Sequence, residues 1–368
     1  MRTHLKFIGG GFAAFLFVAV GCGDDGDTAE TGFGSGEHFS IAGALRQIPI
    51  EFAADFDGNI ELYVADLMAA DDAMGQSRPT GLTDADAAFD WLEPMIGREE
   101  GPVFVPVAPT LTNITAIGEY KDEVGFAVTE ADATIESPAQ PLTMTVVAGD
   151  LQHASATEVA EGVFTIGQGD DFEIDLLDVT AARPLGRPLR AAPSDGLVLL
   201  STSTDAASAW LDAASVRLDS DEAFALAAEI LDRREVIGAA LFRRDFSAEA
   251  SLAAIVEDGT NTVRAPIATS FDTIAVGWGE DDGNAAITVV YVTVDETAAA
   301  AAAAEIEAAF SSGISQQTNQ PIADLVIVDD VTTDGRTIVV SLHLPDDRQR
   351  PIVILEMIVS QDVPFIYG

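Results

Sequence analysis

The sequence predicts an α+β protein with two tandem related units, each a mainly antiparallel sheet with helices packed on one face. First, 48% of the 368 residues are hydrophobic and the mean hydropathy is positive, so the chain has ample material for a core. Second, short apolar segments separated by turn residues are typical of hairpins. Third, the order strand, strand, helix, hairpin occurs twice, with similar spacing but without residue identity. We therefore expect one unit over residues 41–203 and a second over residues 204–368.

The first unit is expected to consist of strands and one short helix. The turn "DFDGN" leads into the strand "IELYVADL", and Ser155 with Glu158 has the spacing of a capping box at the start of the helix. Alternating and β-branched residues predict the other segments as strands. The predicted elements are strands at 60–67, 111–120, 141–150, 162–167 and 172–179, a helix at 155–161, and a hairpin over 187–203.

The second unit has clearer helix signals. Thr204 and Ser220 are the expected N-caps of two amphipathic helices, and a third helix has Asp295 as its cap and Gly313 as its stop. Alternation places every second residue of 338–344 on one buried face of the last strand. The predicted elements are helices at 204–215, 219–234 and 295–313, a strand at 236–242, hairpins of 272–278 with 285–294 and of 323–331 with 336–344, and a helix within 350–368.

Residues 1–21 have the composition of a secretory signal peptide. Arg2 and Lys6 precede an apolar segment at residues 7–20, and no acidic residue lies among them. As a helix, that segment would span about 21 Å, which is short of the ~30 Å hydrocarbon core of a membrane. A positive start and a short apolar stretch therefore predict a cleaved signal and not a membrane span.

Cys22 is the only cysteine and follows the apolar segment in "AVGC". This sequence resembles the lipobox of bacterial lipoproteins, although that family prefers Leu where Ala19 stands. The resemblance implies cleavage before Cys22 and lipidation of Cys22, which anchors the protein to a membrane and faces it outward. It also implies, because Gly23 and not Asp follows the cysteine, sorting towards the outer membrane in a host that has one. The alternative is a plain signal peptide with Cys22 as a bystander thiol.

Two further features are the composition of residues 22–40, which precede the globular body, and the overall charge of the chain. Residues 22–40 are rich in Gly, Asp, Ser and Thr and predict a flexible tether. The chain has 61 acidic and 18 basic residues, a formal charge of −43. Such a surface repels phosphate backbones, so no nucleic-acid partner is expected. The acidic composition has two kinds of interpretation. It can serve solubility or life in high salt, or it can serve the binding of cations or basic partners.

Two segments of the body are "IELYVADLMAADDAMG" and "ARPLGRPLRAAPSDGLVLLSTSTDAASAWLDA". On these segments, most of the body resembles uncharacterised exported proteins of high-GC bacteria. It implies export and no particular activity.

The residues that usually carry catalysis are sparse. After the predicted cleavage the histidines are His38, His153 and His343, no Ser lies in a G-x-S-x-G elbow, and no Walker A sequence occurs. Zinc needs clustered His or Cys ligands, which the sequence lacks. We therefore predict no cofactor, no metal site and no catalytic residue, and Cys22 is the single site residue assigned.

Two acidic patterns leave other functions open. Asp55, Asp57, Asn59 and Glu61 alternate like the start of an EF-hand, but the glycine lies at loop position four and no Glu closes the loop, which favours a plain turn. Paired carboxylates for glycoside cleavage can lie anywhere among so many acids. Trp91, Trp210 and Trp278 are candidates for a sugar platform, although Trp210 lies on an apolar helical stripe typical of a core.

Together these patterns predict a lipid-anchored extracytoplasmic protein. We expect a non-enzymatic module that binds a ligand or an envelope partner. The alternatives are an extracytoplasmic hydrolase that uses paired carboxylates and a calcium-dependent adhesion module.

Overall fold

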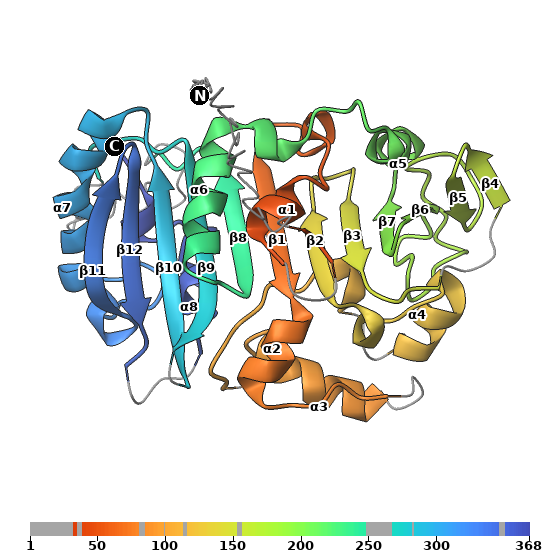
Figure 1. Cartoon of the computed structure of the whole chain (residues 1–368), viewed down its shortest axis with the longest axis horizontal. Helices are drawn as coiled ribbons and strands as arrows, with labels where there is room; N and C mark the ends of the chain where they lie inside the picture. Colours follow the sequence, from red (N-terminus) through yellow and green to blue (C-terminus); the bar gives the residue numbers. More distant parts are fainter. Residues whose placement is uncertain are drawn as a thin grey trace, which may run out of the picture. The chain divides into compact units, whose positions relative to one another are not determined.

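A computed structural model describes residues 32–34, 39–80, 85–98, 100–112, 116–152, 157–247, 267–281, 283–345 and 350–368. These residues form an α+β protein with one antiparallel sheet of twelve strands, ordered β11-β12-β10-β9-β8-β1-β2-β3-β7-β6-β5-β4 (Figure 1). Residues 31–368 form one compact unit.

The elements of this unit lie as follows. The eight described helices are α1 (Ile41–Leu45), α2 (Leu67–Met74), α3 (Ala85–Met95), α4 (Ile117–Val124), α5 (Thr204–Leu211), α6 (Glu222–Arg233), α7 (Glu296–Ser312) and α8 (Val353–Val359). The strands are β1 (Ile60–Asp66), β2 (Ala133–Ser137), β3 (Met144–Ala148), β4 (Thr157–Ala160), β5 (Val163–Ile166), β6 (Leu189–Ser194), β7 (Leu197–Ser201), β8 (Gly238–Arg243), β9 (Thr273–Asp281), β10 (Asn284–Val292), β11 (Ile327–Asp334) and β12 (Thr337–His343).

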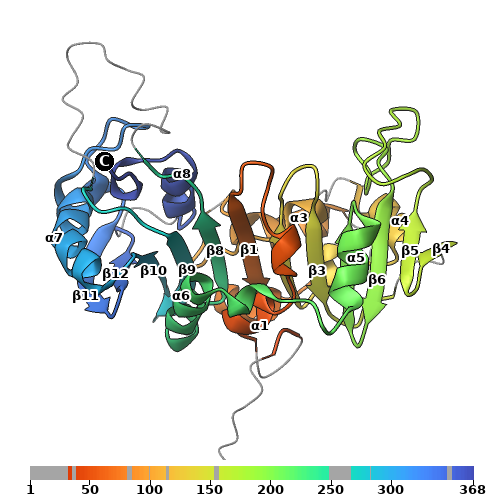
Figure 2. The same cartoon turned by 90° about the horizontal axis from the view of Figure 1, so that it is seen from above.

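Helices cover both faces of the sheet, so the prediction of helices on one face is wrong. α1, α5 and α6 pack on one face, whereas α2, α3, α4, α7 and α8 pack on the other. In Figure 2 α1 and α6 lie below the strands and α8 lies above them. The physical reason is visible in β2 and β3, where every residue is buried. A strand that is buried on both sides has structure covering both sides.

The five strands nearest the β1–β8 junction follow the same order on its two sides, and β5 and β4 extend the sheet beyond β6 on one side only. Outward from this junction the sheet runs β1-β2-β3-β7-β6 in one direction and β8-β9-β10-β12-β11 in the other. β1 and β8 pair antiparallel from Ile60 opposite Arg243 to Ala65 opposite Gly238. The predicted boundary after residue 203 lies in the chain between β7 and α5. The strands that precede it and the strands that follow it belong to one continuous sheet.

Most predicted elements of the second half are confirmed. The hairpins β9–β10 and β11–β12 and the strand β8 form where expected, and α8 lies within the C-terminal segment. Asp295 caps α7 by accepting a hydrogen bond from the backbone N of Ala298, and Gly313 follows the helix. Ile338, Val340 and Leu342 are all buried in the core under α7.

The predicted N-caps of α5 and α6 are wrong by one residue in opposite directions. Ser203, not Thr204, caps α5 through the backbone N of Ala206. Asp221, not Ser220, caps α6. Neighbouring Ser, Thr and Asp residues all suit an N-cap. Contacts with the rest of the fold decide between them, because Asp221 also binds Arg243 of β8.

Three predictions in the first half are wrong. Where a strand was predicted at 111–120, Leu111 ends a 3₁₀ helix and Ile117 begins α4, whose buried Ile117, Tyr120 and Val124 have helical and not alternating spacing. Residues 157–160 form β4, paired with β5, where a helix was expected. Ser155 of the proposed capping box lies outside the described residues. The predicted strand at 172–179 is an exposed loop between β5 and β6.

Candidate functional site

The candidate site is a cavity of about 370 Å³ on the sheet. Its walls come from strands β2, β3, β6 and β7, from the 3₁₀ helix Pro109–Leu111, and from residues 181–187, which lead into β6. Most of the lining is apolar, with the hydroxyls of four threonines, 110, 143, 145 and 202, among it. A cavity of this volume with a few polar groups is typical of a site for a small organic molecule.

Strand register places Glu136 at this cavity. Tyr63 of β1, Glu136 of β2, Thr145 of β3 and Leu200 of β7 stand opposite one another in one row across the sheet. Side chains in such a row lie on the same face. Glu136 is therefore in the interior of the sheet, and only 1% of its surface is exposed.

Among the described residues, Glu136 has hydroxyl and amide partners but no cationic one. The hydroxyl of Thr145 donates to Oε2 of Glu136 at 2.9 Å, and the backbone N of Thr110 donates to the same oxygen at 3.3 Å. Burial raises the pKa of Glu136, and these hydrogen bonds oppose that rise without cancelling it. The carboxyl group thus has a tendency to hold a proton, which lets it donate as well as accept a hydrogen bond.

Arg187 also lines the cavity and has an unused donor. Its Nε is buried and makes no hydrogen bond within the described chain. Arg183, on the same wall, differs because it binds Glu123 at 2.6 Å and Asp178 at 2.7 Å. Arg187 is therefore the guanidinium that a bound anion would meet. Arginine favours carboxylates and similar planar anions because its donors form a fork.

The part of the lining that the structure describes holds no pair of converging carboxylates. Glu136 is the one acidic side chain among the described residues that line the cavity. Hydrolysis by two carboxylates requires both within roughly 5 to 10 Å of each other, on either side of the scissile bond. The lining also differs in charge from the whole chain, since it contains Arg183 and Arg187 beside a single acidic residue.

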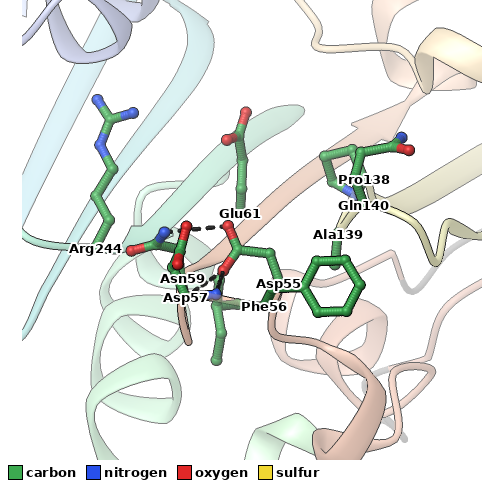
Figure 3. A pocket seen from close by; sticks show the side chains of 10 residues that line it. Asp55, Phe56, Asp57, Asn59, Glu61, Pro138, Ala139, Gln140 and Arg244 are labelled. Atoms are coloured by element: carbon green, nitrogen blue, oxygen red, sulfur yellow. Dashed lines mark hydrogen bonds between the residues drawn. The ribbon is translucent and has the colours of Figure 1, made fainter.

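A second, smaller pocket of about 290 Å³ adjoins the first, because Pro138 and Gln140 line both. Figure 3 shows the side chains of Glu61 and Arg244 both extending away from the turn that carries Asp55 and Asn59. Glu61 accepts a hydrogen bond from the hydroxyl of Tyr63, its neighbour on β1.

The residues 55–61 form a turn, as the sequence favoured. Oδ1 of Asp55 accepts from the backbone N of Asp57 and of Asn59, each at 2.9 Å, and Oδ2 accepts from Nδ2 of Asn59 at 3.1 Å (Figure 3). Both carboxylate oxygens of Asp55 thus accept hydrogen bonds within the turn itself. Within the part of the chain that the structure describes, no three His, Cys, Asp or Glu side chains form a metal-binding group.

The other residues singled out by sequence lie away from the cavity or outside the described ranges. His343 is half-exposed near the sheet edge, with its Nδ1 2.7 Å from Oδ1 of Asp329. Cys22, His38 and His153 lie outside the described residues. None of the helices in the described ranges has the length and apolar character needed to span a membrane.

The tryptophans belong to the core and not to a sugar platform. Trp91, Trp210 and Trp278 are 4%, 6% and 0% exposed. The ring nitrogen of Trp91 donates to Asp71 at 2.6 Å, and that of Trp278 donates to the carbonyl of Pro351 at 2.9 Å. The core assignment of Trp210 is confirmed, and the platform is excluded for all three side chains.

Sequence reasoning did not find Glu136 or Arg187. One signal was available: in "ATIES" a single charge interrupts a strand that is otherwise suited to burial. Arg187 offered no comparable signal, because its place in the cavity depends on the path of the 168–188 segment. Comparisons with protein-family models, with curated protein sequences and with solved structures found no match to this chain.

Proposed function

We propose that this protein is a lipid-anchored extracytoplasmic binding protein whose cavity receives a small organic anion with an apolar body. The observation that carries the proposal is the buried, unbonded Nε of Arg187 in a largely apolar cavity that also contains Glu136. Arg187 would hold the anionic group, while Glu136 and the threonines would bind hydroxyl or carbonyl groups. The apolar walls would enclose the rest of the ligand.

The proposal is tested by binding of matched compounds to residues 31–368. Hexanoate and benzoate are compared with hexanol and benzyl alcohol by calorimetry and by the shift in melting temperature. We expect the anions to bind more tightly and Arg187→Met to lower their affinity at least tenfold. Arg234→Met, which removes an exposed arginine of the same length, is the control and should bind as the unmodified chain does. Equal binding of the alcohols and the anions, or an Arg187→Met variant with full affinity, would contradict the proposal.

The membrane anchor is a separate part of the proposal. It is supported by the signal-like residues 1–21 and by Cys22 at the lipobox-like position. Cys22→Ser is expected to release the protein from the membrane fraction of the cell, because cleavage and acylation both require the thiol-bearing residue. Asp24→Asn, two residues away, serves as the control and should stay with the membrane. A Cys22→Ser variant that still sediments with membranes would rule out the lipid anchor.

We also propose that residues 41–203 and 204–368 are two related units that share the single sheet. The support is the matching order of the five strands on the two sides of the β1–β8 junction.

The two alternative functions, a hydrolase and a calcium-dependent adhesion module, receive less support. A hydrolase needs a second carboxylate beside Glu136, and calcium-dependent adhesion needs the oxygens that Asp55 uses within its own turn.

A further inference from the structure

The loop at residues 170–179 exposes a series of large apolar side chains; we call it the apolar loop. Ile174, Leu176, Leu177 and Val179 are 51%, 69%, 99% and 51% exposed. Single exposed apolar residues are common on protein surfaces, but several on one short loop are typical of an interaction surface. The loop leads from β5 towards β6.

The loop is held in place by buried arginines. Asp171 binds Arg190 at 2.7 Å, and Asp178 binds Arg183 at 2.7 Å, while both arginine side chains are about 5% exposed or less. Asp171 also accepts hydrogen bonds from the backbone N and the hydroxyl of Thr204 at the start of α5. The loop is therefore fixed to the body near both of its ends.

A close backbone approach fixes the middle of the loop. Gly186 has a φ of +65°, and a Cβ there would lie 1.7 Å from the carbonyl oxygen of Asp175. Only glycine fits this contact. Phe172 has a φ of +64°, a strained conformation for a bulky residue, and such strain persists only where surrounding contacts impose it. The apolar side chains are thus presented by a defined backbone.

Negative charge surrounds these apolar side chains. Asp170, Glu173 and Asp175 are exposed, and none of them has a cationic partner among the described residues. Glu173 and Asp175 instead accept hydrogen bonds from backbone nitrogens of the loop itself. Lysine or arginine side chains are the groups that complement this charge.

We propose that the apolar loop is a docking surface for a basic amphipathic segment of a partner protein. Apolar side chains of the partner would cover Ile174, Leu176 and Leu177, and its lysines or arginines would face Glu173 and Asp175. A second copy of the chain or an anionic membrane fits poorly, because each would bring like charge to the loop.

The probe is a synthetic 18-residue helical peptide of leucine and lysine with leucine along one face. Its binding to the chain from residue 31 onwards, which forms the compact unit, is measured by fluorescence anisotropy at several salt concentrations. A peptide of the same composition in scrambled order has the same charge but no apolar face. We expect the amphipathic peptide to bind at least tenfold more tightly than the scrambled one.

Two variants separate apolar contact from charge. Leu176→Ser with Leu177→Ser should lower the affinity for the amphipathic peptide at least tenfold and leave the scrambled peptide unaffected. Glu173→Gln with Asp175→Asn should weaken binding and reduce its dependence on salt. Val216→Ser, which changes a side chain 61% exposed elsewhere on the surface, is the control and should bind normally. Melting temperatures close to that of the parent chain would show that the variants fold.

Three results would overturn the proposal. One is an unchanged affinity of the double serine variant for the amphipathic peptide, which would mean that charge alone drives binding. The second is self-association of the parent chain in sedimentation that the double serine variant loses, which would make a second copy the occupant. The third is binding of the parent chain to phosphatidylcholine vesicles that is lost in the same variant, which would make lipid the occupant.

Discussion

Glu136 is a carboxyl group whose surroundings favour its neutral form. Its partners are a hydroxyl and a backbone amide, and burial has the largest effect on its pKa, which it raises. The folded state therefore binds a proton more tightly than the unfolded chain does. The free energy of unfolding then falls as the pH rises through the ordinary pKa of a glutamate and towards the raised pKa in the folded state. Each unit by which folding raises the pKa of Glu136 corresponds to about 1.4 kcal/mol in the free energy of unfolding.

Glu136→Gln should for this reason stabilise the protein at pH 8 and have little effect at pH 4. Gln keeps an oxygen that can accept from Thr145 and Thr110 but cannot ionise. The measurement is the melting temperature of both proteins between pH 4 and pH 8. Glu161→Gln changes an exposed glutamate of the β4–β5 turn and should show no comparable pH dependence. A Gln variant that melts lower than the parent chain throughout this pH range would contradict the expectation.

Among the elements, α6 depends on one residue at its start. Oδ1 of Asp221 accepts hydrogen bonds from the backbone N of Ala223 at 3.1 Å and of Phe224 at 3.3 Å. Both oxygens of Asp221 also accept from Arg243 of β8, at 2.7 and 2.6 Å. The guanidinium of Arg243 lies 4.6 Å from the centre of the Phe224 ring. One carboxylate thus both caps the helix and fastens it to the sheet.

Asp221→Ala is expected to lower the free energy of unfolding by about 1 to 2 kcal/mol, because the cap of α6 is lost. The same change leaves Arg243 without its carboxylate partner, which lowers the free energy of unfolding further. Asp221→Asn keeps a cap and should cost less. The hydrogen bond from Arg243 has the largest effect in lowering the pKa of Asp221, so its stabilisation is present above the ordinary aspartate pKa and is lost as the pH falls through the folded value.

Urea unfolding of the Asp221 variants at pH 7 and pH 3 measures both effects. Ser220→Ala is the matched control, because sequence alone favoured this residue as the cap and the structure gives that role to Asp221. A loss for Ser220→Ala as large as for Asp221→Ala would show that the cap is assigned wrongly.

Elements with local signals are predictable from sequence, and those set by distant contacts are not. α7 has a cap, a stop and a helical stripe within its own residues, and it forms as predicted. The segment at 172–179 alternates like a strand, but Arg183 binds its Asp178 and Arg190 binds Asp171 just before it, which no local pattern reveals. The cavity is hidden for the same reason, since Glu136 meets Thr145 through strand register and Arg187 arrives on a separate segment.

At the scale of the whole molecule, the two halves of the sheet share a core. The apolar layer beneath α1, α5 and α6 contains Val64 and Ile135 from the first half with Phe224 and Leu241 from the second. β1 and β8 also pair along the junction. Separating the halves would uncover this layer and leave two strand edges without partners, which is costly.

We therefore expect residues 31–368 to unfold in one cooperative thermal transition. The test is scanning calorimetry, in which the calorimetric and van't Hoff enthalpies should agree when the transition is all-or-none. Two resolved transitions, or a van't Hoff enthalpy near half the calorimetric one, would show that residues 41–203 and 204–368 melt independently.

The acidic side chains have a further consequence at the two open edges of the sheet. β11 forms one edge and carries Asp329, Asp330 and Asp334, and its register with β12 is broken between Val328 and Asp330. β4 forms the other edge and carries Glu158, and its register with β5 is broken before Ala160. Bare strand edges recruit other chains into fibrils, and charge together with irregular pairing hinders that recruitment. Acidic side chains and irregular pairing at both edges thus oppose the aggregation of a twelve-stranded sheet with its neighbours at high local concentration.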